Sequence, residues 1–62
     1  MKLFLVNYLE DNYDGHYLTV GTDQDTEEDI EKREYDKKDW GFLYFFGVTE
    51  IKEVNGHKII LE

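Results

Sequence analysis

The chain has 62 residues, no cysteine and a formal net charge of −8 at pH 7, from 15 acidic and 7 basic side chains. A chain of this length forms one small domain that buries only about 60% of its extended surface, and without cysteine it is not a disulfide-stabilised fold. The charge opposes binding to nucleic acid or to an anionic membrane and favours a basic protein partner.

A hairpin is predicted at the start of the chain. Residues 2–10 are apolar at nearly every position, which is typical of a strand buried on both faces. The pair Asp14-Gly15 is a strong signal for a tight turn, and residues 16–22 then form the returning strand. Alternation along the first strand places its aromatic side chains on one side and its leucines on the other.

The charged segment that follows predicts one short acidic helix over residues 26–38. Asp25 or Thr26 can serve as its N-cap, with an acidic residue three positions later to complete a capping box. Acidic side chains lie at the N-terminal end of this segment and lysines at its C-terminal end, which is the arrangement that the helix dipole favours. The side that would face a sheet reads Ile30, Arg33, Glu34 and Lys37. With so few apolar groups on that side, we expect the helix to be loosely held.

A second hairpin is predicted after the helix. The aromatic-rich residues 41–54 form a long third strand, in which Gly47 indicates a bulge or bend. Asn55-Gly56 is a strong signal for a two-residue turn before a fourth strand over residues 57–62. Such a turn sets these residues opposite one another: Val54 and His57, Glu53 and Lys58, and Ile51 and Ile60. The predicted fold is therefore α+β, a small ββαββ domain with a four-stranded antiparallel sheet of two hairpins and one short acidic helix.

The two predicted turns share a sequence pattern, YDGHYL in residues 13–18 and VNGHKI in residues 54–59. A duplicated ββ unit would explain the pattern, and so would two tight turns that independently favour the same residues, because Asp-Gly and Asn-Gly suit such turns. We favour the second explanation, since repeats normally share more than a turn.

No arrangement of residues points to catalysis or to a bound cofactor. His16 and His57 each follow a glycine but lack the spacing of metal ligands, and the chain contains neither serine nor cysteine as a nucleophile. Paired acids such as Glu27-Glu28 lie in a solvated segment, whereas catalytic carboxylates need partial burial. We therefore expect no enzyme activity, no cofactor and no metal site.

Both sides of the central strands carry large apolar side chains, and one helix can cover only one side of a sheet. Either irregular strands hide the remainder, or the uncovered side meets another chain. We favour the second interpretation and expect a homodimer or higher oligomer that buries aromatic residues of the first and third strands.

The segment of residues 23–39 contains nine acidic and four basic residues. A charged run of this kind is either a solvated face or a surface that imitates the phosphates of nucleic acid and binds a basic, nucleic-acid-binding protein. On the second interpretation the partner-binding residues are Glu27, Glu28, Asp29, Glu31, Glu34 and Asp36, with Asp11 and Asp14 as a secondary patch and Tyr35 and Trp40 as aromatic anchors.

In size, acidity and lack of catalytic groups the chain is similar to small inhibitors made by bacteriophages and mobile elements, including anti-CRISPR and anti-restriction proteins that block host nucleases. Six lysines against one arginine also fit an AT-rich bacterial or phage genome. This likeness is one of general character and assigns no role to any residue.

Two classes of function therefore follow from the sequence. The first is a non-enzymatic acidic protein that inhibits or regulates a basic partner, and the alternative is a structural module that assembles through an aromatic sheet face and has no inhibitory role. A complex held by charge weakens steeply with salt, whereas an apolar interface does not. With no leader or membrane span predicted, we expect a cytoplasmic protein in either case.

Overall fold

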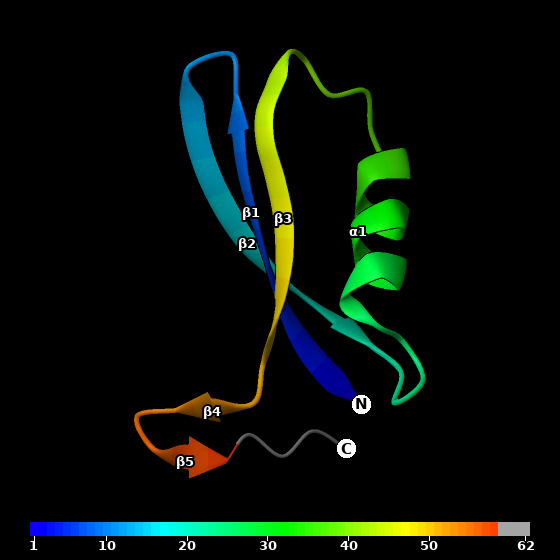
Figure 1. Ribbon diagram of the computed structural model, residues 1–62, viewed down its shortest axis with the longest axis vertical. Coiled ribbons are helices and arrows are strands. Elements are labelled where there is room, and N and C mark those ends of the chain that lie inside the picture. Colours follow the sequence, from blue (N-terminus) through cyan, green and yellow to red (C-terminus); the bar gives the residue numbers. More distant parts are fainter. Residues whose placement is uncertain (59–62) are drawn as a thin grey trace.

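A computed structural model describes residues 1–58 of the chain (Figure 1). The elements in chain order are β1 (Lys2–Glu10), β2 (Tyr13–Gly21), α1 (Glu27–Asp36), β3 (Leu43–Ile51), β4 (Glu53–Val54) and β5 (His57–Lys58). β1, β2 and β3 form an antiparallel sheet in the order β2-β1-β3, whereas β4 pairs with β5 in a separate hairpin. The α+β class with one helix is therefore confirmed over the described residues. The expected four-stranded sheet is replaced by a three-stranded sheet and a two-stranded one.

The predicted turn at Asp14-Gly15 is wrong, because the chain turns three residues earlier. Asp11 and Asn12 form the turn, with φ of 47° and 67°, a left-handed backbone that Asp and Asn tolerate better than most residues. A turn at the predicted position would have set the middle of β1 opposite the acidic residues that follow β2. The observed register sets it opposite the apolar middle of β2 instead. The apolar match between the strands thus decides the register.

Two glycines within strands make room for aromatic rings. Gly15 lies in β2 directly opposite Tyr8, and any Cβ at Gly15 would overlap the Tyr8 ring. Gly47 is paired regularly with β1, and a Cβ there would lie 2.8 Å from a ring carbon of Phe45. The predicted bulge at Gly47 is therefore wrong, and the irregularity in the pairing of β1 with β3 lies at the end of β1.

β3 ends earlier than the predicted strand over residues 41–54. Leu3 of β1 is paired with Ile51, so only Lys2 of β1 remains beyond this pair. The residues that follow Ile51 have no further length of β1 to pair with, and the chain leaves the sheet. The length of β1 therefore sets the end of β3.

The turn at Asn55-Gly56 is confirmed. Its residues have φ of 53° and 80°, and the two predicted pairs nearest to the turn join β4 to β5. The predicted pair that includes Ile60 lies outside the described residues, as does most of the predicted strand over 57–62. Because Gly15 lies within a strand and Gly56 within a turn, the shared sequence pattern occupies two different places in the fold.

α1 begins with the capping box that the sequence predicts. Thr26 is the N-cap, and its Oγ1 accepts a hydrogen bond of 3.2 Å from the backbone N–H of Asp29. In return the Asp29 carboxylate accepts one of 2.9 Å from the backbone N–H of Thr26. These bonds satisfy backbone donors at the helix start that have no partner within the helix. The helix lies within the predicted range 26–38 and ends at Asp36.

The core lies between α1 and one face of the sheet, and it is small. Phe4 and Val6 of β1 and Ile30 of α1 are the fully buried apolar side chains among the described residues. Gly21 at the end of β2 allows the helix to approach this closely. A Cβ at Gly21 would lie 2.9 Å from Ile30 Cδ1 and 3.0 Å from a ring carbon of Phe4.

Polar contacts tie α1 to both outer strands of the sheet. Arg33 Nη2 donates hydrogen bonds of 3.0 Å each to Thr19 Oγ1 and to the backbone carbonyl of Val20 on β2. The Glu27 carboxylate accepts one of 2.8 Å from the backbone N–H of Glu50 on β3. The backbone groups of Val20 and Glu50 lie on edge strands, where unpaired groups invite pairing with other chains. The helix is thus held more firmly than its few apolar residues predict.

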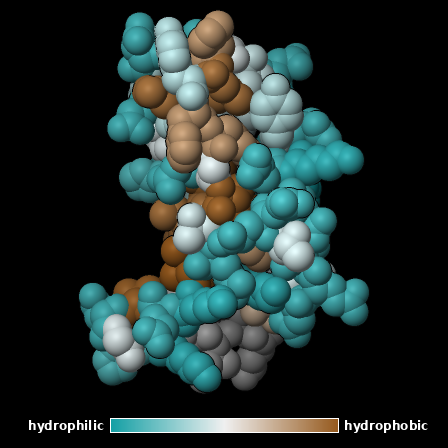
Figure 2. All heavy atoms as spheres, in the orientation of Figure 1, coloured by the Kyte–Doolittle hydropathy of each residue, from teal (hydrophilic) through white to brown (hydrophobic). Residues whose placement is uncertain are grey.

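The face of the sheet turned away from α1 is apolar. Cross-strand pairing places Leu18 beside Leu5 and Val20 beside Leu3 on this face, and Leu18 and Val20 are 60% and 43% exposed. In Figure 2 apolar residues gather along the strands, whereas hydrophilic residues lie over α1. We call this surface the open sheet face, and it comprises Leu3, Leu5, Leu9, Leu18, Val20, Phe45 and Ile51.

The aromatic residues of β1, which the sequence predicted at an interface, do not lie on the open sheet face. Phe4 is buried on the helix side, and Tyr8 shares that side with its cross-strand partner Phe46 on β3. Among the aromatic residues of β1 and β3, Phe45 lies on the open sheet face, opposite Leu9. Tyr44 of β3 and Phe42 just before it are also 61% and 66% exposed, so the described chain offers aromatic as well as aliphatic side chains to a partner.

Candidate functional site

One predicted partner-binding residue, Glu34, points into the protein. Its side chain is 1% exposed, and its carboxylate accepts hydrogen bonds of 2.8 Å from the Tyr17 hydroxyl, 3.0 Å from Arg33 Nε and 3.1 Å from Lys37 Nζ. The sequence placed Glu34 both on the side of the helix that faces a sheet and among the partner-binding residues, and in the structure its side chain faces the sheet. This carboxylate holds α1 against β2 and is not accessible to a partner.

The contacts of Glu34 favour its ionised form. Burial on its own acts to raise the pKa of Glu34, but the hydrogen bonds from Tyr17, Lys37 and Arg33 outweigh it and hold that pKa below its usual value of 4.5. Burial and the hydrogen bond to Glu34 together raise the pKa of the Tyr17 hydroxyl well above its usual value. Glu34 is thus a carboxylate and Tyr17 a neutral donor at physiological pH.

Most basic side chains near the helix are paired with carboxylates. Arg33 and Lys37 pair with the buried Glu34, while Lys38 Nζ lies 3.7 Å from the Glu10 carboxylate and 4.2 Å from the centre of the Trp40 ring. Lys32 is the remaining basic residue of this segment, and no ion pair between described residues includes it. The positive charge of the segment is largely used to hold the fold together.

The outward side of the helix retains acidic groups that have no such use. Within the described part of the chain, the side chains of Glu28, Glu31 and Asp36 are exposed and form no hydrogen bond or ion pair. Glu27 and Asp29 are also exposed, but Glu27 binds the edge of β3 and Asp29 completes the capping box. The backbone and side-chain hydrogen bonds from Thr26 lower the pKa of Asp29.

The secondary acidic patch is not brought together with the helix. The backbone N–H of Asp11 donates to the carbonyl of Phe42 at 3.0 Å, and the Asp11 carboxylate accepts from the N–H of Phe42 at 3.2 Å, so this residue fastens the first turn to the segment before β3. Asp14 lies in β2 opposite Leu9, on the side of the open sheet face. The two acids therefore have separate surroundings and do not extend the helix surface.

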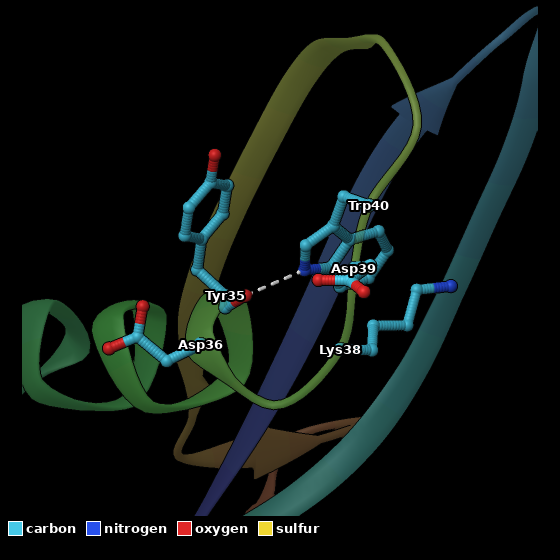
Figure 3. A pocket seen from close by; sticks show the side chains of 5 residues that line it. All are labelled: Tyr35, Asp36, Lys38, Asp39 and Trp40. Carbon is cyan, nitrogen blue, oxygen red and sulfur yellow. Dashed lines mark hydrogen bonds between the residues drawn. The ribbon is translucent and has the colours of Figure 1, made fainter.

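The two predicted aromatic anchors differ in how much they expose. Trp40 is half-buried, with its ring centre 5.1 Å from those of Tyr8 and Phe46, and its Nε1 donates a 3.0 Å hydrogen bond to the carbonyl of Tyr35 (Figure 3). Tyr35 meets Phe46 edge to face at 5.8 Å and remains 51% exposed. Tyr35 is therefore accessible to a partner, whereas Trp40 mainly belongs to the internal aromatic cluster.

A shallow pocket lies where the helix ends, and it joins these aromatic residues to acidic groups. Tyr35, Asp36, Lys38, Asp39 and Trp40 line it (Figure 3). Asp39 was not among the predicted site residues, although its sequence position close to Asp36 on the charged segment would have indicated it. The surface that the structure offers to a partner is thus Glu28, Glu31, Asp36 and Asp39 with Tyr35 among them, which we call the outer helix surface.

Other kinds of site find little support among residues 1–58. His16 and His57 are both exposed, and no cluster of three or more potential metal ligands occurs in this range. No helix in the same range has the length and apolar composition needed to cross a lipid bilayer. Comparisons of the chain with protein-family models, with curated proteins and with solved structures found no match. The outer helix surface is therefore the candidate site among the described residues.

Proposed function

We propose that the chain is a non-enzymatic acidic binding protein that uses the outer helix surface to bind a basic protein, of the kind that itself binds nucleic acid. The observation that carries this proposal is the division of charge around α1. Arg33, Lys37 and Lys38 form ion pairs with Glu34 and Glu10. Of the basic residues of this segment only Lys32 therefore remains beside the outer acids, which outnumber it and keep an excess of negative charge.

Such a surface suits a partner that binds phosphates. A groove for nucleic acid carries lysine and arginine side chains, and its affinity is mainly electrostatic. Carboxylates spaced along one side of a helix offer those side chains an alternative set of anions. Each exposed pair contributes only a few tenths of a kcal/mol, so binding depends on the whole set and on long-range attraction. By occupying the groove, the chain acts as an inhibitor, in the manner of small phage and mobile-element proteins that imitate nucleic acid.

A paired-variant experiment tests this proposal. Glu28→Lys combined with Asp36→Lys reverses two acids of the outer helix surface, and Asp14→Lys combined with Glu53→Lys makes the same change in net charge away from it. Both variants alter exposed side chains, so both should fold. Each protein is immobilised and exposed to a bacterial lysate at low and high salt, and the retained proteins are identified.

The proposal predicts that the wild type and the Asp14/Glu53 variant retain the same basic proteins at low salt and lose them at high salt. The Glu28/Asp36 variant should retain them weakly at either salt concentration. Equal retention by both variants would contradict the proposal, and the acidic residues would then serve only to solvate the helix.

The open sheet face favours a second candidate function, a small assembly module whose charge only keeps it in solution. A module of this kind needs no contact through α1, so reversal of Glu28 and Asp36 would leave its assembly intact. High salt would also fail to dissociate it, because an apolar interface does not depend on screened charges.

A further inference from the structure

We propose that a second copy of this chain packs on the open sheet face, giving a dimer of two sheets with the α1 helices on the outer sides. This proposal rests on the composition and area of that face and is independent of the function of the outer helix surface. It differs from the interface expected from the sequence in that the aromatic residues of β1 take no part in it.

The face is almost free of charge in a chain that is 35% charged. The register of the three strands places twelve residues on this side of the sheet, from alternate positions of β1, β2 and β3. Asp14 is the one acidic residue among them, His16 is the one histidine, and both belong to the start of β2. The remaining positions are Leu3, Leu5, Asn7, Leu9, Leu18, Val20, Phe45, Gly47, Thr49 and Ile51.

This composition identifies the occupant. A basic protein would meet hardly any carboxylate here to offset the desolvation of its own cations, so the face does not suit the partner proposed for α1. The open sheet face would instead pack well against another uncharged apolar sheet, and the same face of a second copy is a sheet of this kind. Because a twofold axis brings the same patch of both copies together, the leucine and valine side chains of one copy can interdigitate with those of the other.

The area is sufficient for a reversible dimer. Each of the three strands has nine residues, so at about 3.3 Å per residue and about 4.8 Å between strands the face measures roughly 30 by 14 Å. Two such faces bury roughly 1,000 Å² in total once the relief of the side chains is included, which lies at the lower end for specific interfaces. A dimer that dissociates on dilution is therefore expected.

Repulsion between two chains of net charge −8 does not prevent this arrangement. Packed sheets lie about 10 Å apart, and each α1 lies beyond its own sheet (Figure 1). The outer helix surfaces of the two copies are therefore separated by more than the Debye length, about 8 Å at physiological ionic strength. The small core also gains a second buried layer, which a domain of this size needs.

Sedimentation velocity over a hundredfold dilution series tests the proposal on three proteins. These are the wild type, Leu18→Glu on the open sheet face, and Val54→Glu on the β4–β5 hairpin as the matched control, since the two side chains are 60% and 52% exposed. The wild type and Val54→Glu should form dimers that dissociate on dilution. The dimer affinity of Leu18→Glu should be lower by at least about a hundredfold, because the variant places an unpaired carboxylate in an apolar interface.

A wild type that is monomeric at every concentration would overturn the proposal. The face would then be covered by a segment of the same chain or by another protein. Equal dimerisation by Leu18→Glu and Val54→Glu would overturn it too. If Leu18→Glu fails to fold, the wild type decides the matter through its unfolding temperature. That temperature rises with protein concentration for a dimer and is constant for a monomer.

Discussion

Among the acidic residues of α1, replacement of the buried Glu34 is predicted to be the most destabilising. Glu34→Gln keeps the size and shape of the side chain but removes its charge and sets an amide group beside Arg33 and Lys37. The hydrogen bonds from these two residues and from Tyr17, at 3.0, 3.1 and 2.8 Å, are charge-assisted in the wild type. Breaking a buried ion pair by removing one partner commonly costs about 3–5 kcal/mol.

The exposure of the partners reduces this cost. The side chains of Arg33 and Lys37 are 40% and 61% exposed, so water can solvate both cations once the carboxylate is gone. The Tyr17 hydroxyl still finds the amide oxygen of the new side chain as an acceptor. The loss of free energy of unfolding should therefore be about 2 kcal/mol, the worth of one or two hydrogen bonds to a charged group.

Urea unfolding, followed by the fluorescence of the single tryptophan, measures this loss. Trp40 lies between Tyr8 and Phe46, so its emission reports whether the sheet and the segment after α1 stay together. Glu31→Gln makes the same substitution on the outer side of the helix and should change stability by less than about 0.5 kcal/mol. Equal stability of the two variants would refute the role assigned to Glu34.

Two further predictions concern pH and the packing of the helix. The pKa values of Glu34, Asp29 and Asp23 are all lowered by folding, from usual values of 4.5 for Glu and 3.8 for Asp. The folded state therefore binds fewer protons than the unfolded chain, and the stability that this difference provides is complete above about pH 5 and is lost as pH falls through the lowered values. Glu34→Gln should show a shallower acid loss in urea titrations, and equal slopes would contradict this. Gly21→Ala should cost about 1–3 kcal/mol, because its Cβ would press on Ile30 and Phe4; a thermal melt identical to that of the wild type would show that the helix can shift at no cost.

The local signals in the sequence predicted those parts of the fold that short segments determine. Thr26 and Asp29 form the capping box, and Asn55-Gly56 forms a turn, because each depends on neighbours within three residues. The Asp14-Gly15 signal failed because a register is a property of two whole strands. The apolar match between β1 and β2 outweighed the preference of one dipeptide, and Gly15 proved to be needed under the Tyr8 ring.

The site was predicted only in part for a related reason. The sequence placed Ile30, Arg33, Glu34 and Lys37 on one side of the helix, and this side does face the sheet. It did not reveal that Tyr17 on β2 donates a hydrogen bond to the buried Glu34, because that contact depends on the corrected register. Once Glu34 is seen to draw Arg33 and Lys37 inward, the unpaired acids of the outer helix surface follow directly.

The proposed role of the outer helix surface is tested most directly by the salt dependence of binding to one purified partner, captured as described above. Affinity is measured by calorimetry at several salt concentrations for the wild type, the Glu28→Lys/Asp36→Lys variant and the Asp14→Lys/Glu53→Lys variant. The wild type and the Asp14/Glu53 variant should lose affinity steeply and in parallel as salt rises, whereas the Glu28/Asp36 variant should bind weakly with a much flatter dependence. Equal affinity and equal salt dependence of all three proteins would contradict the proposal that the outer helix surface binds the partner.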